Sequence, residues 1–309
     1  MRLTTSLKAS ALALSLVSTP VLAKSRTPAP TLTPVPTATN SSLDNLTVSQ
    51  AFPAWQSTVK YELPTAGGAQ FFGNYARITT QIRYDAATNS YIVRDTGKAS
   101  KTSTFAPANV VGAESDATFT VYRKVTGSTT ETLRLLNPGA GNPLIALTYV
   151  SYGAWRQTTP GTGFQGATQV SDTYFVYGIK TAPADMPRIG TASYNTVIDG
   201  TFVNKTGPYT LSGTGNFLAN FAAGTISYTA TPVGTPASGP VLNFGLVGGS
   251  GSIAFGNSSF AGTPNTALNP TYKMGLVGYF FGPAASEIGA NFQLSGGGGN
   301  GNGVMVGHQ

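Results

Sequence analysis

The sequence predicts an all-β protein. An N-terminal β-rich, handle-like domain precedes a C-terminal antiparallel β-barrel of about eight strands, with a short helical turn at one end of the barrel. Many short segments are rich in β-branched and aromatic residues or alternate apolar with polar residues, as half-buried strands do. Glycine accounts for 38 of 309 residues and only 9% of residues are charged, which is typical of short strands joined by tight turns. Strands at this spacing favour a closed barrel, because closure removes the sheet edges.

The first 23 residues are predicted to be a Sec signal peptide. Arg2 and Lys8 precede an apolar stretch at 9–17, which is too short to span a bilayer, and small residues surround Ala23. No cysteine stands at the expected cleavage point, so no covalent lipid anchor is expected. We therefore expect an exported protein, extracellular or on the outer-membrane surface, with the periplasm left open. Residues 24–45 carry four prolines among Thr, Ala and Ser and predict an extended linker.

A shift in composition divides the remaining chain into two domains. Residues 46–189 hold 12 Lys and Arg and 8 Asp and Glu. Residues 190–309 hold 25 glycines but only four charged residues, Asp199, Lys205, Lys273 and Glu287. The boundary falls in the Pro- and Gly-containing segment 183–190. We expect the β-rich domain over 46–189, with strands at 118–123, 147–152 and 173–177, and the barrel over 190–309.

The barrel strands follow from the period-two pattern. They are expected near residues 192–202, 209–221, 224–233, 240–246, 250–256, 258–262, 272–281 and 288–295, with a last short strand at 303–308. Ile226, Tyr228 and Ala230 should face one side, as should Leu242, Phe244 and Leu246, while Ser, Thr and Asn should cover the outer face. Both 248–251 and 296–303 predict hairpin turns, because neither is followed by the helix and Lys-Ser/Thr of a phosphate loop. Within 282–289, Pro283 suits a first helical position and Gly289 an exit, which predicts a single helical turn.

Residues 278–292 read Gly-Tyr-Phe-Phe-Gly-Pro-Ala-Ala-Ser-Glu-Ile-Gly-Ala-Asn-Phe. This segment resembles the signature near the end of the transferrin-binding protein B type β-barrel domain. The matching residues are Gly278, Phe280, Phe281, Gly282, Pro283, Glu287, Gly289 and Phe292, whereas Ala290 stands where that family usually has glycine. Segments 190–200 and 303–308 look like the family's first and last barrel strands, and 151–156 and 175–178 look like parts of its preceding domain.

The resemblance implies a solute-binding protein that is exported to the surface. Members of this family bind transferrin, haemoglobin, haem or complement regulators, and many leave the cell through outer-membrane export machinery that recognises the barrel. The matching residues shape the barrel and need not touch a ligand, and fold alone does not fix function.

The chain lacks the usual residues of catalytic and metal sites. It has no cysteine and a single histidine, His308, which excludes thiol chemistry, zinc fingers and iron–sulfur clusters. No nucleophile–base pair can be named, so we expect no enzyme activity. Glu114 and Asp116 are the only close carboxylate pair, and a solvated loop is their expected place. The sequence has no stripe of Lys and Arg residues that would predict nucleic-acid binding.

The candidate binding residues are aromatic and basic. They are Tyr149, Tyr152, Trp155 and Arg156, with Tyr174 and Tyr177 nearby in the chain. Such a group could stack on a planar ligand such as haem or an aryl iron chelate while arginine pairs with a carboxylate. The alternative is packing between the two domains, with Arg156 reaching solvent. Haem is a possible cofactor because tyrosine can serve as an axial ligand. The other candidate ligands are Met186, Met274, Met305 and His308.

These observations predict a non-enzymatic binding protein that captures haem, an iron chelate or an iron-carrying host protein. Two alternatives stay open. One is an outer-membrane β-barrel protein, although the chain ends in Gln309 rather than an aromatic residue. The other is a structural or adhesive surface protein without a small ligand.

Overall fold

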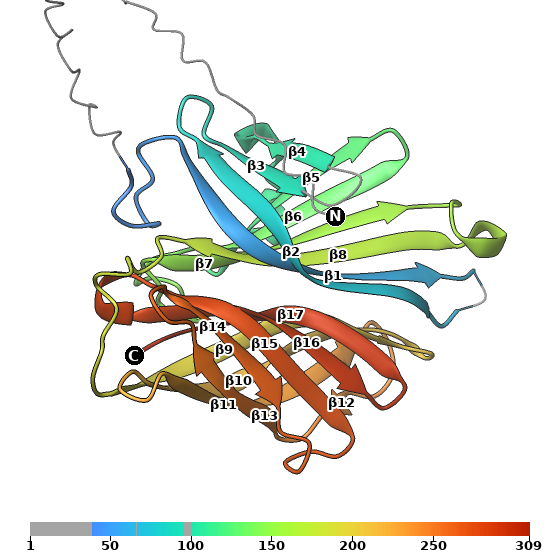
Figure 1. Cartoon of the computed structure of the whole chain (residues 1–309). Coiled ribbons are helices and arrows are strands. Elements are labelled where there is room, and N and C mark those ends of the chain that lie inside the picture. Colours follow the sequence, from blue (N-terminus) through green and yellow to red (C-terminus); the bar gives the residue numbers. More distant parts are fainter. Residues whose placement is uncertain (1–38, 66, 96–100) are drawn as a thin grey trace, which may run out of the picture. The chain divides into compact units, whose positions relative to one another are not determined.

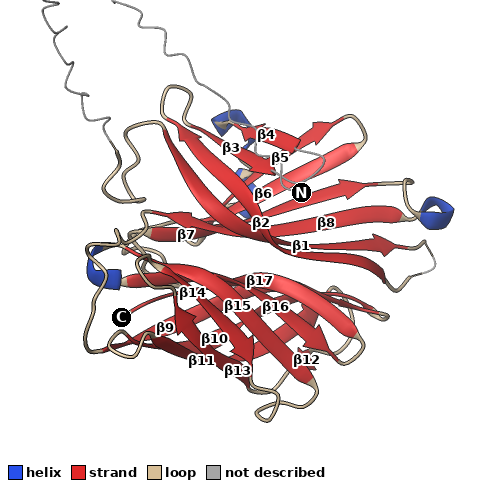
Figure 2. Cartoon of the chain, viewed as in Figure 1, coloured by secondary structure: helices blue, strands red, loops and turns tan. Residues whose placement is uncertain are grey.

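The computed structural model describes residues 39–65, 67–95 and 101–309, with the backbone alone for 70–80 and 95. The predicted signal peptide and most of the predicted linker lie outside the described residues. Strands provide nearly all the regular structure described, and the helical parts are three-residue 3-10 turns (Figure 2). The all-β prediction is confirmed. None of the described helices has the length and apolar character needed to cross a membrane.

The first sheet is antiparallel and has eight strands (Figure 1). They are β1 (Gln50–Leu63), β2 (Gln70–Asp85), β3 (Ser90–Asp95), β4 (Lys101–Phe105), β5 (Phe119–Thr126), β6 (Thr129–Leu136), β7 (Val150–Thr159) and β8 (Thr168–Gly178). Their spatial order is β4-β3-β2-β1-β8-β7-β6-β5, so the first strand pairs with the last. The two edge strands, β4 and β5, do not pair, but a side chain bridges them. The Lys124 ammonium donates to the Thr104 carbonyl oxygen at 2.9 Å and lies 4.8 Å from the Phe105 ring centroid.

One face of this sheet builds its own apolar core. The buried side chains include Phe52, Ile82, Val93, Phe105, Leu133, Leu135, Trp155, Phe175 and Tyr177. Residues 39–45, which the sequence assigns to the linker, lie against the sheet. Leu43 is buried in this core, and its backbone N–H donates to the Thr148 carbonyl oxygen at 2.8 Å.

The second sheet closes into the predicted barrel. Its eight closing strands are β9 (Thr191–Asn204), β10 (Gly207–Asn220), β11 (Thr225–Pro236), β13 (Val247–Ile253), β14 (Ser259–Pro264), β15 (Tyr272–Phe281), β16 (Glu287–Gly296) and β17 (Gly299–His308). Closure comes from the pairing of β9 with β17 and of β10 with β11. As expected, Ile226, Tyr228 and Ala230 face inward, and the interior is filled with side chains, many of them aromatic.

Two expected barrel elements are wrong, and a third is only partly correct. The strand predicted at 240–246 is reduced to β12 (Leu242–Asn243), because Gly245 takes a left-handed φ of 70° and turns Leu246 toward solvent. The glycines at 248–251 are not a hairpin turn but lie inside β13. A Cβ on Gly249 would sit 2.6 Å from the Tyr228 hydroxyl, so glycine there makes room for a buried ring. In 296–303, only the first residues form a turn and the rest belong to β17.

The helical turn is present but shorter than expected. It covers Pro283–Ala285, and Ala285 is buried in the barrel core, where its carbonyl oxygen accepts a 2.6 Å hydrogen bond from the Tyr194 hydroxyl. Gly289 does not close a helix, because it lies within β16. A Cβ there would collide with Val176 of the first sheet, so this glycine permits the close approach of the two sheets.

Candidate functional site

The two sheets belong to one compact unit, and the barrel's only two carboxylates both contact the first sheet. Asp199 on β9 accepts hydrogen bonds from the Arg134 guanidinium and, at 2.8 Å, from the Tyr152 hydroxyl. Glu287 accepts three backbone N–H groups, those of residues 148–150, at 2.7–2.8 Å. Apolar side chains surround these contacts and complete the layer between the sheets.

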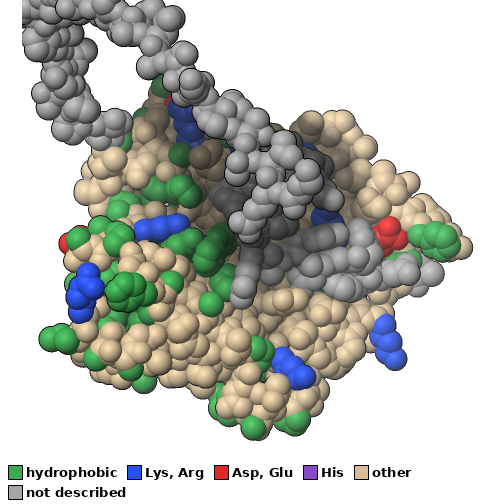
Figure 3. Space-filling model, viewed as in Figure 1, with side chains coloured by type: hydrophobic (Ala, Val, Ile, Leu, Met, Phe, Trp, Pro, Cys, Tyr) green, Lys and Arg blue, Asp and Glu red, His purple; other side chains and the backbone are tan. Residues whose placement is uncertain are grey.

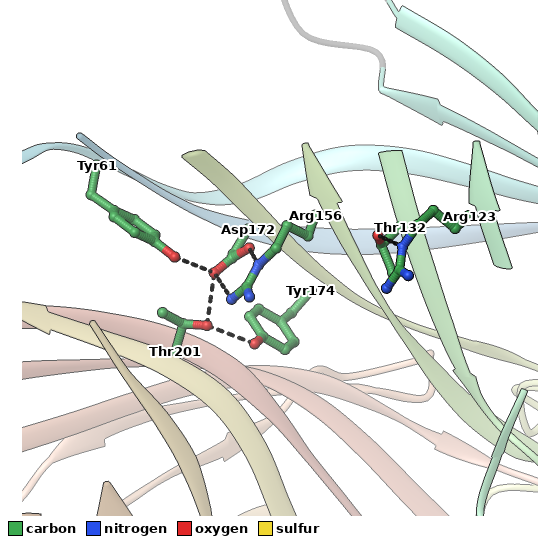
Figure 4. A network of polar contacts seen from close by, with 7 residues as sticks. All are labelled: Tyr61, Arg123, Thr132, Arg156, Asp172, Tyr174 and Thr201. Atoms are coloured by element: carbon green, nitrogen blue, oxygen red, sulfur yellow. Dashed lines mark hydrogen bonds and ion pairs between the residues drawn. The ribbon is translucent and has the colours of Figure 1, made fainter. Parts of the chain in front are cut away.

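A second buried carboxylate network lies beside the first (Figure 4). Asp172 on β8 accepts two hydrogen bonds from Arg156, at 2.6 and 2.7 Å, and one from the Tyr61 hydroxyl at 3.2 Å. Thr201 of the barrel donates to the same carboxylate at 3.0 Å, and its hydroxyl lies 2.8 Å from that of Tyr174. The Asp172 carboxylate thus ties three strands of the first sheet to the barrel.

Electrostatics fix the protonation states in this network. The adjacent Asp172 carboxylate raises the pKa of Arg156 above its usual value. Burial, and then the Asp172 charge, raise the pKa of Tyr61 and of Tyr174. The tyrosines are therefore neutral phenols near neutral pH.

Three arginines lie on the face of the first sheet that is turned toward the barrel. Arg123, Thr132 and Arg156 stand opposite one another on β5, β6 and β7, so their side chains share a face, and Arg134 lies two residues from Thr132 on the same face. The side chains of Arg123, Arg134 and Arg156 are 41%, 31% and 49% exposed. Arg123 is held by Glu114 through hydrogen bonds of 2.7 and 2.8 Å, whereas the other two are held by buried carboxylates.

These arginines line a groove between the first sheet and the barrel. The groove consists of two adjoining hollows of about 390 and 420 Å³ that share Arg156 and Thr210. The first hollow contains all three arginines. The second is more apolar, and its lining includes Tyr61, Leu63, Val170, Pro208, Tyr209 and Pro236. We call the whole feature the interlayer groove. Its two ends differ in chemistry: one holds three arginines, each paired with a carboxylate, and the other is more apolar.

The six predicted binding residues do not form one surface. Tyr152, Tyr174 and Arg156 face the barrel, and both tyrosines are buried. Trp155 and Tyr177 lie in the core on the opposite face of the sheet, and the Trp155 indole N–H donates to Glu131 at 3.2 Å. Tyr149 is half-buried beside the helical turn, where a Cβ on Gly282 would meet its ring.

The other candidate ligands for haem iron are scattered. Met274 and Met305 lie inside the barrel, and Met186 packs against the barrel core at one end. His308 ends β17, and its Nδ1 lies 2.8 Å from the Gln309 carbonyl oxygen. Within the described part of the chain, no three His, Asp or Glu side chains gather as a metal site would require.

The motif residues and the predicted carboxylate pair have structural surroundings. Phe280 and Phe292 fill the barrel, and Phe281 packs between the sheets. Glu114 and Asp116 point to different partners. Asp116 accepts the backbone N–H groups of Phe119 and Thr118, which lower its pKa, while Glu114 holds Arg123.

Sequence reasoning missed Arg123, Arg134 and Asp172. The hairpin joining β5 and β6 could have indicated that Arg123 and Arg134 share a face, since both strands carry alternating patterns. Asp172 is an isolated acidic residue just before the aromatic residues of β8. An acid in such an apolar segment indicates a buried carboxylate that pairs with a cation.

No family model and no curated protein matches the chain. Among solved structures, intact transferrin-binding protein B with its N and C lobes (Ap-TbpB) is 13% identical over 87% of this chain and 79% of that chain, with a TM-score of 0.43. A double mutant of this protein from Haemophilus parasuis Hp5 is 11% identical over 84% and 76%, with a TM-score of 0.42. A mutant from Actinobacillus pleuropneumoniae H49 is 12% identical over 83% and 100%, with a TM-score of 0.39. Identities and TM-scores this low carry no conclusion about a ligand of this chain.

Proposed function

We propose that the chain is an exported, non-enzymatic binding protein that captures haem, or an iron chelate of similar size, in the interlayer groove. The observation that carries the proposal is the groove itself, in which three partly exposed arginines adjoin an apolar hollow edged by tyrosines. The predicted signal peptide and the resemblance of residues 278–292 to a family of surface binding proteins support export and a binding role.

The two ends of the groove suit the two parts of a haem molecule. Arginine–carboxylate hydrogen bonds are charge-assisted and geometrically specific, so an arginine that exchanges its present carboxylate partner for a propionate could hold the ligand at this end. Arg123 is the most available donor, because its bond to Glu114 joins two half-exposed groups and such pairs contribute little free energy. The apolar end, with Leu63, Pro208 and Tyr209, suits the macrocycle.

The proposal assigns no iron ligation to Tyr61 and Tyr174, whose hydroxyls bond within the protein. Burial raises the pKa of Tyr61 and Tyr174, which disfavours the phenolate that would bind ferric iron. The proposal therefore depends on recognition of the ring and its carboxylates.

The outer wall of the barrel favours this function over a bilayer-spanning one. Side chains that point outward from β10 are polar for most of its length, among them Thr210, Ser212, Thr214 and Asn216. A barrel embedded in lipid presents an apolar band there. The same hydroxyl- and amide-rich wall suits contact with water.

A hemin titration tests the proposal. We expect saturable binding at about one equivalent, visible in the haem absorption band and in tryptophan quenching, because Trp155 lies in the core just behind the strand β7 that carries Arg156 into the groove. Arg123→Gln should weaken binding by roughly tenfold, since it removes one charge-assisted contact. Glu114→Gln should strengthen binding, because it releases Arg123.

Two controls sharpen this experiment. Lys205→Gln removes one positive charge from the β9–β10 turn, outside the groove, and should leave the affinity unchanged. Metal-free protoporphyrin should bind comparably if the ring and carboxylates are what the groove recognises. Absence of saturation, or equal affinities for Arg123→Gln and Glu114→Gln, would contradict the proposal.

A further inference from the structure

One end of the barrel carries the two most exposed large apolar side chains of the described residues. Phe255, in the turn between β13 and β14, is 99% exposed, and Ile189, just before β9, is 82% exposed. Phe255 also forms part of the lining of a cleft of about 350 Å³, together with Pro183, Met186, Phe221 and Ile253 among others. Clustered apolar side chains that protrude into water mark interaction surfaces.

Two opposite charges lie on the same segment. Asp185 and Arg188 are both exposed, and neither has an ion-pair partner among residues 39–65, 67–95 and 101–309. Charged side chains are otherwise sparse on this molecule, as the face in Figure 3 illustrates. The surface therefore combines a protruding ring, a cleft, one acid and one base.

We propose that this barrel end is the interface of a dimer of two copies of the chain. A two-fold contact must be self-complementary, because the same patch serves both subunits. Here each copy offers a projecting ring, Phe255, at the edge of a cleft that can receive the same ring of the partner subunit. Two-fold symmetry also brings Arg188 of one copy to Asp185 of the partner subunit, so two ion pairs form together.

The charge balance favours a second copy over a membrane. A lipid surface attracts clusters of Lys and Arg, whereas this patch carries one exposed base, Arg188, and one exposed acid, Asp185, three residues away. A symmetric contact requires each feature of one copy to meet its complement on the other. Here the apolar projections can meet clefts, and each acid can meet a base.

Sedimentation velocity over a wide range of concentrations tests the proposal on protein purified from cells that express the full sequence. We expect a monomer–dimer equilibrium. Phe255→Ser should raise the dissociation constant by roughly tenfold or more, as loss of a buried aromatic anchor does. Asp185→Arg and Arg188→Asp should each weaken the dimer through like-charge repulsion, and the double variant Asp185→Arg/Arg188→Asp should restore it.

Phe164→Ser is the matched control, because Phe164 is also highly exposed but lies in the 3-10 turn (Phe164–Gly166) between β7 and β8. It should leave the equilibrium unchanged. A protein that stays monomeric, a dimer that is insensitive to Phe255→Ser, or a double charge variant no better than the singles would overturn the proposal. Hemin binding is measured separately, so failure of the dimer and failure of the groove are distinguishable.

Discussion

Lys180 shows how the meeting of the two sheets changes a single side chain. Its ammonium lies 3.4 Å from the ring centroid of Tyr279, whose ring is in turn 4.5 Å from that of Trp55. The aromatic face favours the charged form, but burial opposes it more strongly and lowers the pKa of Lys180 to about 8. An ordinary surface lysine would keep its charge well above that pH.

This lysine predicts a pH dependence of stability. In the unfolded chain Lys180 binds its proton up to about pH 10.4, so between about pH 8 and pH 10 the unfolded state holds more protons than the folded state. The contribution of Lys180 to the free energy of unfolding should therefore rise with pH in this window, whereas the buried tyrosines, whose pKa values are raised, begin to contribute in the opposite sense toward pH 10. Urea unfolding at about pH 7 and about pH 9.5 measures the rise, and Lys180→Met should reduce it. An equal rise in Lys180→Met would show that other groups cause it.

Gly289 is needed because no side chain fits between the sheets at its position. A Cβ would collide with Val176 and lie 2.8 Å from the Val150 side chain. Gly289→Ala should lower the free energy of unfolding by about 1–3 kcal/mol, as overpacking does. Gly275→Ala on the adjacent strand is the control, since its Cβ would meet nothing closer than 3.6 Å. Chemical unfolding of both variants checks this, and equal losses would contradict it.

At the scale of elements, the alternating pattern predicted strands correctly where one face of the strand points into the barrel's own core. Ile226, Tyr228 and Ala230 on β11 are an example. The pattern failed at 240–246, because the φ of Gly245 ends the strand there. The turn expected at the glycine-rich segment 248–251 was wrong because glycine there makes room for the Tyr228 ring from another strand. Alternation within one segment carries no information about either.

Packing of the two sheets against each other depends on Asp199. This carboxylate of β9 accepts hydrogen bonds from Arg134 on β6 and Tyr152 on β7, so its loss leaves a guanidinium and a phenol without their acceptor. Asp199→Ala should lower the free energy of unfolding by about 2–4 kcal/mol. Glu114→Gln, which breaks an exposed pair, should cost under about 1 kcal/mol. Denaturant unfolding compares the two, and a loss for Asp199→Ala as small as that for Glu114→Gln would contradict the role given to this contact.

At the scale of the whole molecule, composition predicted the barrel and its nearly charge-free wall. It also suggested that residues 46–189 and 190–309 differ in character. The interlayer groove could not be predicted, because it exists only where the two sheets face each other. Arg134 and Asp199 meet across 65 positions of sequence, and no local pattern reports such a contact.

Both sheets join their first strand to their last, β1 to β8 and β9 to β17. Thr58 and Thr173, whose hydroxyls lie 2.9 Å apart, are separated by 115 positions. Contacts this distant in sequence form slowly, because a long loop must close before they contribute any free energy. During vectorial synthesis or translocation, neither sheet can close until its final strand has emerged. Each sheet thus stays open until the whole of it is available, and only then does it fold.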